Sequence, residues 1–220
     1  MRYIIIAMLS VLIAQESNKE LISFSSANPF SFEEIITDLE NQEAQEVFGI
    51  LTLPKNFNSN QKYPLIIGVA GSLNWSSHHL EYLKMYNEMG FATFQLQSFD
   101  SRDIQSTVGS QTEVTTAMVI LDSYRALEAL SQHPNIDVDK VGITGWSLGG
   151  GVSLYSAWLP LIDAINNRKF MFAAHLPIYP ACMAYPYPAE NMQFSTSPIH
   201  ILIGELDNWV PAAACIELIE

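Results

Sequence analysis

Short apolar runs alternate with amphipathic segments along most of this chain. Six runs have the length and composition of buried strands: 47–54, 63–69, 91–96, 141–144, 170–176 and 199–204. Apolar residues recur at helical spacing over 76–89 and 114–130, and Pro211 opens another helix over 211–219. A shorter helix is possible around residues 33–36, whereas the rest of 18–45 carries no interpretable motif.

Strands that alternate with helices predict an α/β fold with a doubly wound, mostly parallel sheet. Ligands of such sheets bind beyond the carboxyl ends of the strands. Five segments follow predicted strands and should meet at this edge: 71–72, 98–102, Ser147, 179–182 and Asp207. The sequence therefore places a candidate site on that edge.

The strand at 141–144 leads into Gly-Trp-Ser-Leu-Gly, which has the G-x-S-x-G spacing of a nucleophile elbow. Gly145 and Gly149 permit a tight turn from strand to helix that exposes the Ser147 hydroxyl. The amide of Leu148 would then form half of an oxyanion hole. The alternative interpretation is a glycine-rich loop with a serine cap, but the flanking strand and small-residue helix favour the elbow.

The chain has 220 residues, 49% of them hydrophobic, and a net charge of −13. This length and composition predict one soluble domain, over 15–220, with a substantial core. The acidic balance, without any run of Lys or Arg, argues against a nucleic-acid partner and against a large anionic polymer as substrate.

The first residues resemble a secretory signal, because Arg2 precedes an apolar stretch at 3–14 that is too short to span a bilayer. With cleavage after Ala14, residues 1–14 would be removed and the protein would be exported, to the periplasm or the medium, with no stable membrane insertion. A first strand or an anchoring helix is the alternative.

These residues together resemble the α/β-hydrolase fold, and more closely the serine-bearing branch of the dienelactone hydrolase family. The resemblance spans 47–220 and is most specific over 121–150, around the elbow, with further matching blocks at 178–182 and 204–211. It implies that Ser147 is the nucleophile and Asp207 the acid of the triad, with Glu205 as the second choice. Asp207 could instead cap the helix that follows.

The family usually has His-Gly where this chain has Ala70-Gly71, but an oxyanion hole needs only backbone N–H groups. We expect the second donor to be the amide of Ser72, with Leu73 as the alternative. Arg102 and Trp146 are the predicted substrate-binding residues, Arg102 by holding a carboxylate; a surface ion pair with Asp100 or Asp103 is the alternative for it.

The chain has two cysteines, and export to an oxidising compartment predicts a disulfide between Cys182 and Cys215, with two buried thiols as the alternative. None of the five histidines follows Asp207, although the triad order of this fold is Ser, Asp, His. Surface or helix-capping roles are expected for all five, and no metal site is expected.

The helix at 211–219 ends without a cap, so we expect the last strand and helix of the fold, and the triad histidine, to lie beyond Glu220. A natural pseudoenzyme that ends there is the alternative. The predicted activity is hydrolysis of a small ester or lactone through an acyl-enzyme, without a cofactor. An inactive binding protein, a peptidase or an acyltransferase on the same scaffold are the alternatives.

Overall fold

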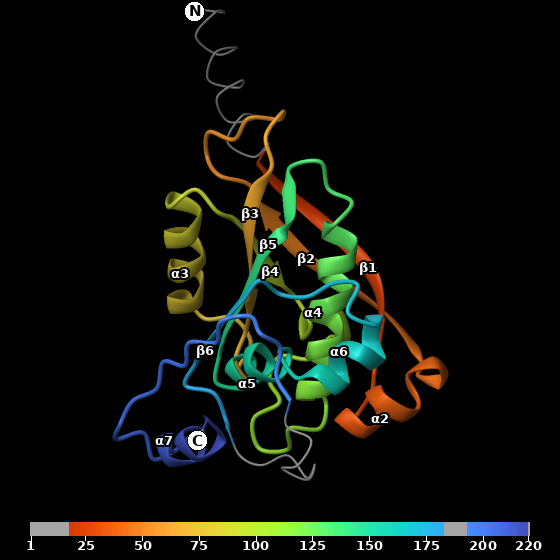
Figure 1. Ribbon diagram of the computed structural model, residues 1–220, viewed down its shortest axis with the longest axis vertical. Coiled ribbons are helices and arrows are strands. Elements are labelled where there is room, and N and C mark those ends of the chain that lie inside the picture. Colours follow the sequence, from red (N-terminus) through yellow and green to blue (C-terminus); the bar gives the residue numbers. More distant parts are fainter. Residues whose placement is uncertain (1–17, 183–192, 220) are drawn as a thin grey trace, which may run out of the picture.

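The computed structural model describes residues 18–182 and 193–219, in which a six-stranded sheet forms the centre (Figure 1). The strand order is β1-β2-β4-β3-β5-β6. β4, β3, β5 and β6 run parallel to one another, whereas β2 and β1 are antiparallel additions at one edge. The strands are β1 (Lys19–Ala27), β2 (Ala44–Thr52), β3 (Tyr63–Val69), β4 (Ala92–Leu96), β5 (Ile136–Trp146) and β6 (Ala174–Ile178). The predicted α/β fold with a mostly parallel sheet is confirmed.

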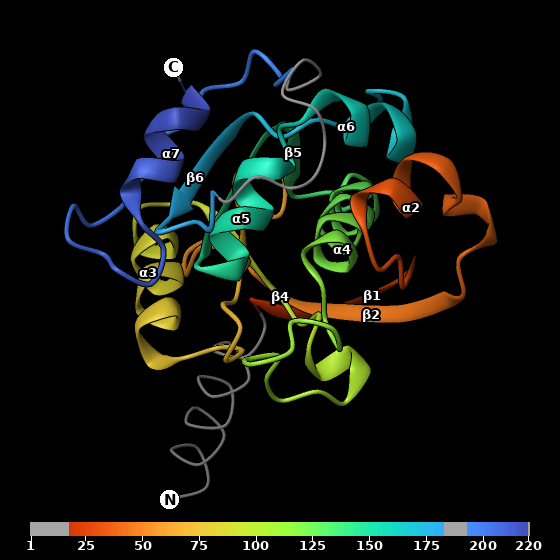
Figure 2. The same cartoon turned by 90° about the horizontal axis from the view of Figure 1, so that it is seen from below.

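Helices cover both faces of this sheet. α3 packs on β4 and β3, while α4 packs on β1 and against α5, and Figure 2 shows α3 and α4 on opposite sides. The helices are α2 (Phe32–Thr37), α3 (Ser77–Glu88), α4 (Thr116–Leu130), α5 (Leu148–Tyr155), α6 (Leu159–Asn166) and α7 (Ala212–Ile219). Short 3-10 turns lie at Leu39–Asn41 and Asp100–Arg102. No helix of the described residues is both long and apolar enough to cross a membrane.

The central strands are apolar because helices cover them on both sides. All residues from Val141 to Trp146 at the end of β5 are buried, and so are Leu65, Ile67 and Val69 of β3. Such strands give continuous apolar runs, which is why the sequence predicted them. The two buried strands β3 and β5 position the turn and the helix that follow β5.

The segment 199–204 differs from the predicted continuous strand, because it contacts β6 only through two isolated bridges. The amide of His200 donates to the oxygen of His175, and that of Leu202 donates to the oxygen of Pro177. Pro177 of β6 lies between the two bridges and has no N–H, so it cannot donate a hydrogen bond to the neighbouring segment. The segment 199–204 therefore runs beside β6 like a strand but lacks the continuous backbone pairing of one.

Two elements were not predicted, and for a third the predicted start was too early in the sequence. β1 is an edge strand whose residues are mostly exposed, so its sequence lacks a clear apolar alternation. α6 has Pro160 in its first turn, where the missing N–H costs no helical hydrogen bond. β6 begins at Ala174, four residues after the predicted start.

Candidate active site

Ser147 occupies a sharp turn between β5 and α5. Its backbone has φ 55° and ψ −112°, a conformation that an L-residue adopts only when its surroundings impose it. The Ser147 amide donates to the oxygen of Ile178 at 3.0 Å, and its own oxygen accepts from the amide of Gly151 at 3.0 Å. These two bonds hold the turn between β6 and α5.

Gly145 and Gly149 are required because backbone atoms lie where a side chain would start. A Cβ atom at Gly145 would lie 2.2 Å from the oxygen of Gly149, and one at Gly149 would lie 2.3 Å from the oxygen of Val69. At Gly151, by contrast, a Cβ atom would meet nothing within 4 Å. The first two glycines let α5 start directly against the strands, as the elbow interpretation requires.

Ser147 also differs from its neighbours in exposure. Every residue from Val141 to Trp158 is buried except Ser147, which is partly exposed. A serine that only capped a helix would not need strained dihedrals or an opening in a buried segment. The turn therefore presents one hydroxyl at the carboxyl edge of the sheet.

The loop after β3 approaches this serine. A Cβ atom at Gly71 would lie 3.7 Å from the Cβ atom of Ser147, and the amide of Asn74 donates back to the oxygen of Gly71. The oxygen of Ser72 accepts from the amide of Thr107 at 2.9 Å, which ties the loop to the segment after β4. The structure thus brings the predicted oxyanion loop to the elbow.

Asp207 follows the strand-like segment 199–204, which lies beside β6. Its Oδ1 atom accepts from the amides of Trp209 and Val210, at 2.9 and 3.0 Å. α7 begins only at Ala212, so these bonds close a turn before the helix. Asp207 is partly buried, whereas Glu205, the alternative acid, is exposed. Among the described residues, no hydrogen bond engages Oδ2 of Asp207.

Tyr179 connects the elbow to the acid loop. It directly follows Ile178, it has φ 35°, and its amide donates to the oxygen of Leu202. Burial raises the pKa of the Tyr179 phenol above its usual value, and the nearby Tyr82 and the carboxylate of Asp207 raise it further. The backbone bond to Leu202 thus ties the residue beside the elbow to the segment that leads to Asp207.

The histidines have varied surroundings. His78 lies at the start of α3, with Nδ1 2.8 Å from Ser76 Oγ and Nε2 3.4 Å from the Tyr179 hydroxyl. His79 takes part in the cap of α3, as expected, and burial first, then His78, lowers its pKa to about 4. His133 pairs with Glu20, and His200 is exposed.

His175 does not have the predicted surface or capping role. It is 2% exposed in the core beside α5, and its Nδ1 lies 2.8 Å from the oxygen of Ser153. None of the histidines within the described residues is hydrogen-bonded to Ser147 or Asp207. The location of the triad histidine beyond Glu220 stays a prediction.

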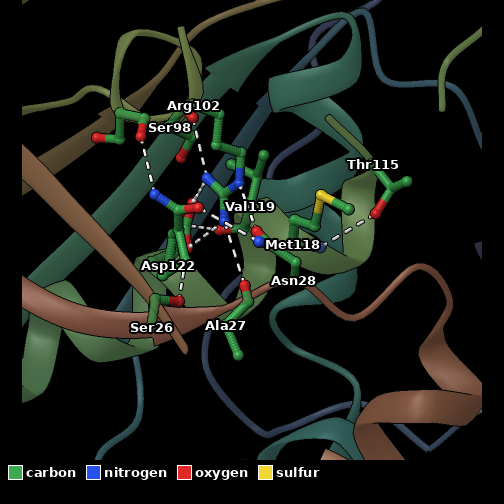
Figure 3. A network of polar contacts seen from close by, with 12 residues as sticks. Ser26, Ala27, Asn28, Ser98, Arg102, Thr115, Met118, Val119 and Asp122 are labelled. Carbon is green, nitrogen blue, oxygen red and sulfur yellow. Dashed lines mark hydrogen bonds and ion pairs between the residues drawn. The ribbon is translucent and has the colours of Figure 1, made fainter. Parts of the chain in front are cut away.

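Arg102 does not have the predicted role of holding a substrate carboxylate. Its guanidinium is buried and forms a bidentate ion pair with Asp122 of α4, with N–O distances of 2.8 and 3.1 Å (Figure 3). The remaining N–H groups donate to Asn28 Oδ1 and to the oxygens of Ser98 and Ala27. All five donors are used, and neither Asp100 nor Asp103 is the partner.

Trp146 does not present its ring to a substrate site either. Its side chain is 1% exposed and stacks on His79 with ring centroids 4.4 Å apart. Trp75 and Tyr82 contact the other parts of the ring, at 6.3 and 5.8 Å between centroids. The indole packs α3 onto the sheet, because the residue before the elbow points away from the exposed serine.

Cys182 and Cys215, the predicted pair, form a disulfide. It joins the segment after β6 to α7, which directly follows the loop of Asp207. The Cα atoms are 5.0 Å apart, and both residues are buried. The bridge therefore fixes α7, and with it one end of the acid loop, to the strand beside the elbow.

The comparisons with known proteins agree with this geometry. Residues 84–220, more than half of the chain, match the dienelactone hydrolase family. The chain belongs to the dienelactone hydrolase family. The matched range contains the elbow, Tyr179 and the Asp207 loop, whereas the loop of Gly71 and Ser72 lies before it.

Solved structures show the same fold. The chain is similar to a dienelactone hydrolase-like promiscuous phosphotriesterase from metagenomic libraries, with a TM-score of 0.61 and 14% identity over 92% of this chain and 75% of that one. It is also similar to Thermogutta terrifontis esterase 2 phosphoramylated by tabun, with a TM-score of 0.63 and 14% identity over 91% and 76% of the two chains. No curated protein has significant sequence similarity. At these identities the structural matches establish the α/β-hydrolase fold of this family member.

Proposed function

We propose that this protein is a serine hydrolase that cleaves a small carboxylic ester or lactone. Ser147 Oγ attacks the carbonyl carbon and transfers its proton to an imidazole, and the imidazolium then protonates the leaving alcohol as the C–O bond breaks. Water repeats the sequence on the acyl-enzyme and releases the acid. The observation that carries this proposal is the strained, partly exposed Ser147 in an otherwise buried segment.

Two backbone amides support a charged tetrahedral intermediate at Ser147. Leu148 is the first residue of α5, and the first N–H groups of a helix have no intrahelical acceptor. Ser72 lies in the loop that approaches Ser147 and is tied there through its oxygen to Thr107. We propose that the amides of Leu148 and Ser72 hold the oxyanion.

Asp207 is the proposed acid, because two amides hold one carboxylate oxygen and the other is available to orient an imidazole. The order of the triad in this fold puts that histidine after Asp207 in the chain. The described residues do not place an imidazole against Ser147, so the assays below use the whole natural gene product.

Export is part of the proposal. It rests on the apolar stretch at 3–14, which lies outside the described residues, and on the Cys182–Cys215 disulfide, because disulfides persist mainly in oxidising compartments. The proposed partner is a small-molecule ester or lactone substrate.

Steady-state hydrolysis of a short-chain aryl ester by the whole gene product tests this function. We expect Ser147→Ala to lower kcat by roughly 10³-fold or more with an unchanged circular dichroism spectrum, and Asp207→Asn to lower it by roughly 10²- to 10⁴-fold. Glu205→Gln is the matched control and should stay within about twofold, because the side chain is exposed.

Retention of most of the activity by Ser147→Ala would overturn the assignment of the nucleophile. A fall in Glu205→Gln as large as that in Asp207→Asn would move the acid to Glu205. If the folded gene product hydrolyses no ester, the alternative of an inactive binding protein on the same scaffold is favoured.

A further inference from the structure

The loops around Ser147 contain almost no positive charge. These loops follow the parallel strands at the edge that Figure 2 views from below, and they comprise residues 70–76, 97–115, 179–182 and 204–211. Arg102 is the single Lys or Arg within them. They contain five acids: Asp100, Asp103, Glu113, Glu205 and Asp207.

Arg102 cannot offset the negative charge of these acids for a bound ligand. Its five donors all bond to protein oxygens, and its side chain is only 6% exposed. Withdrawing it would leave the buried carboxylate of Asp122 without its cation, which is costly. The single positive charge of these loops is therefore already used inside the protein.

The other cations within 18–182 and 193–219 lie away from this edge or are paired locally. Lys19, Lys55, Lys62 and Lys140 lie where the parallel strands begin, at the opposite edge of the sheet, uppermost in Figure 1. Lys84, Arg125 and Arg168 form ion pairs with Glu88, Glu128 and Asp163, and Lys169 lies over the Phe170 ring. The positive charges at that opposite edge lie among acids such as Asp137, which pairs with Lys140, and none of them reaches the loops around Ser147.

Exposed apolar side chains lie on the same loops as the acids at the carboxyl edge. Large apolar side chains are exposed on three of these loops: Leu73, Val108, Leu206 and Trp209. Leu73 follows Ser72 in the loop that approaches Ser147, and Val108 follows Thr107, which bonds to Ser72. Leu206 and Trp209 flank Asp207 within two residues. An acyl group near Ser147 would therefore meet apolar side chains and carboxylates.

We infer that the substrate of this site is an uncharged ester and that carboxylate-bearing esters are discriminated against. This inference rests on the proposed hydrolase function. A substrate carboxylate at the edge would find no free Lys or Arg among the described residues and would be repelled by several acids and by the net charge of −13. A neutral acyl chain would bury apolar surface without that repulsion.

Two aryl esters with four-carbon acyl groups test the inference on the whole gene product. The butyrate ester is neutral, and the hemisuccinate ester carries one carboxylate on an acyl chain of the same length. We expect kcat/KM to be roughly tenfold or more higher for butyrate at low salt. The ratio should shrink as ionic strength rises, because salt screens the repulsion of the anion.

Variants that place an arginine on these loops test the inference further. Val108→Arg and Leu206→Arg should each raise the ratio of hemisuccinate to butyrate kcat/KM severalfold. Leu21→Arg, on β1 towards the opposite edge, also replaces an exposed apolar residue and should leave this ratio unchanged.

Equal or better hydrolysis of hemisuccinate, insensitive to salt, would overturn the inference while leaving the esterase function intact. A ratio that Leu21→Arg changes as much as Val108→Arg would show that net charge, not charge at this edge, decides the preference. Loss of both activities, or hydrolysis that survives in Ser147→Ala, would instead be a failure of the proposed function.

Discussion

The guanidinium of Arg102 and the carboxylate of Asp122 form a buried bidentate ion pair that joins three parts of the fold. Through Arg102 the end of β1, the segment after β4 and helix α4 are connected (Figure 3). Ser26 Oγ adds a hydrogen bond to Asp122 at 2.6 Å. The network fixes the segment that contacts the loop of Ser72.

We predict that Arg102→Met lowers the free energy of unfolding by about 3 to 5 kcal/mol, because it leaves Asp122 buried without a cation. Urea denaturation measures this. Arg125→Met is the matched control, since its pair with Glu128 is partly exposed, at 32% and 45% for the two side chains, and its loss should cost less than about 1 kcal/mol. Equal losses in the two variants would contradict the structural role, as would an unchanged stability with a selective rise in KM for carboxylate esters.

The sequence could not predict this role of Arg102, although it predicted the neighbouring loop. Asp122 lies 20 residues further along the chain on an amphipathic helix, where nothing local distinguishes a buried carboxylate from a solvated one. The elbow was predictable because its requirements are local: a buried strand, two glycines in contact with backbone, and a serine between them.

The same distinction applies to the rest of the site. Asp207 was found from its position after a strand-like segment, but the turn that holds its Oδ1 atom depends on the following residues. Trp146 was expected to bind substrate because it neighbours Ser147, yet alternation along the strand directs its ring towards α3. Its contact with His79 joins residues 67 positions apart, which no local pattern reveals.

We predict that Gly149→Ala lowers the free energy of unfolding by about 3 kcal/mol or more and abolishes ester hydrolysis, because a Cβ atom there would overlap backbone atoms of β3 and the following loop. Gly151→Ala, two residues along the same helix, is the control. It has free space and should be neutral or stabilise by roughly 0.5 to 1 kcal/mol. A tolerated alanine at 149 would contradict the elbow geometry.

Reduction of Cys182–Cys215 should lower the free energy of unfolding by about 3 to 4 kcal/mol, because the bridge closes a loop with a sequence separation of 33. Denaturation with and without dithiothreitol measures the loss. The double variant Cys182→Ser/Cys215→Ser should have the lower stability under both conditions. Two titratable thiols in the unreduced, denatured protein would refute the bridge.

Stability should fall as the pH drops from about 6.5 towards 4, in part through His175. Burial lowers the pKa of His175 to about 4, and its hydrogen bond with Ser153 offsets only a part of this shift. The unfolded chain, with a pKa near 6.5, binds the proton first, so the contribution is fully present above that pH and is lost below it. It amounts to about 3 kcal/mol.

Urea unfolding at pH 7.5 and 4.5 tests this contribution. His175→Gln should make stability less dependent on pH over this range than it is in the wild type. His200→Gln, which removes an exposed imidazole, is the matched control and should not. An unaltered pH dependence in His175→Gln would show that the buried imidazole is not the group responsible.

The central claim is that Ser147 is an activated nucleophile, and covalent labelling tests it most directly. The whole gene product is incubated with a fluorophosphonate, and the adduct is located by peptide mass spectrometry while residual esterase activity is followed. We predict one adduct per chain, on Ser147, formed in proportion to the loss of activity. Full activity loss with the adduct on another serine, or an active enzyme whose Ser147 stays unlabelled, would contradict it.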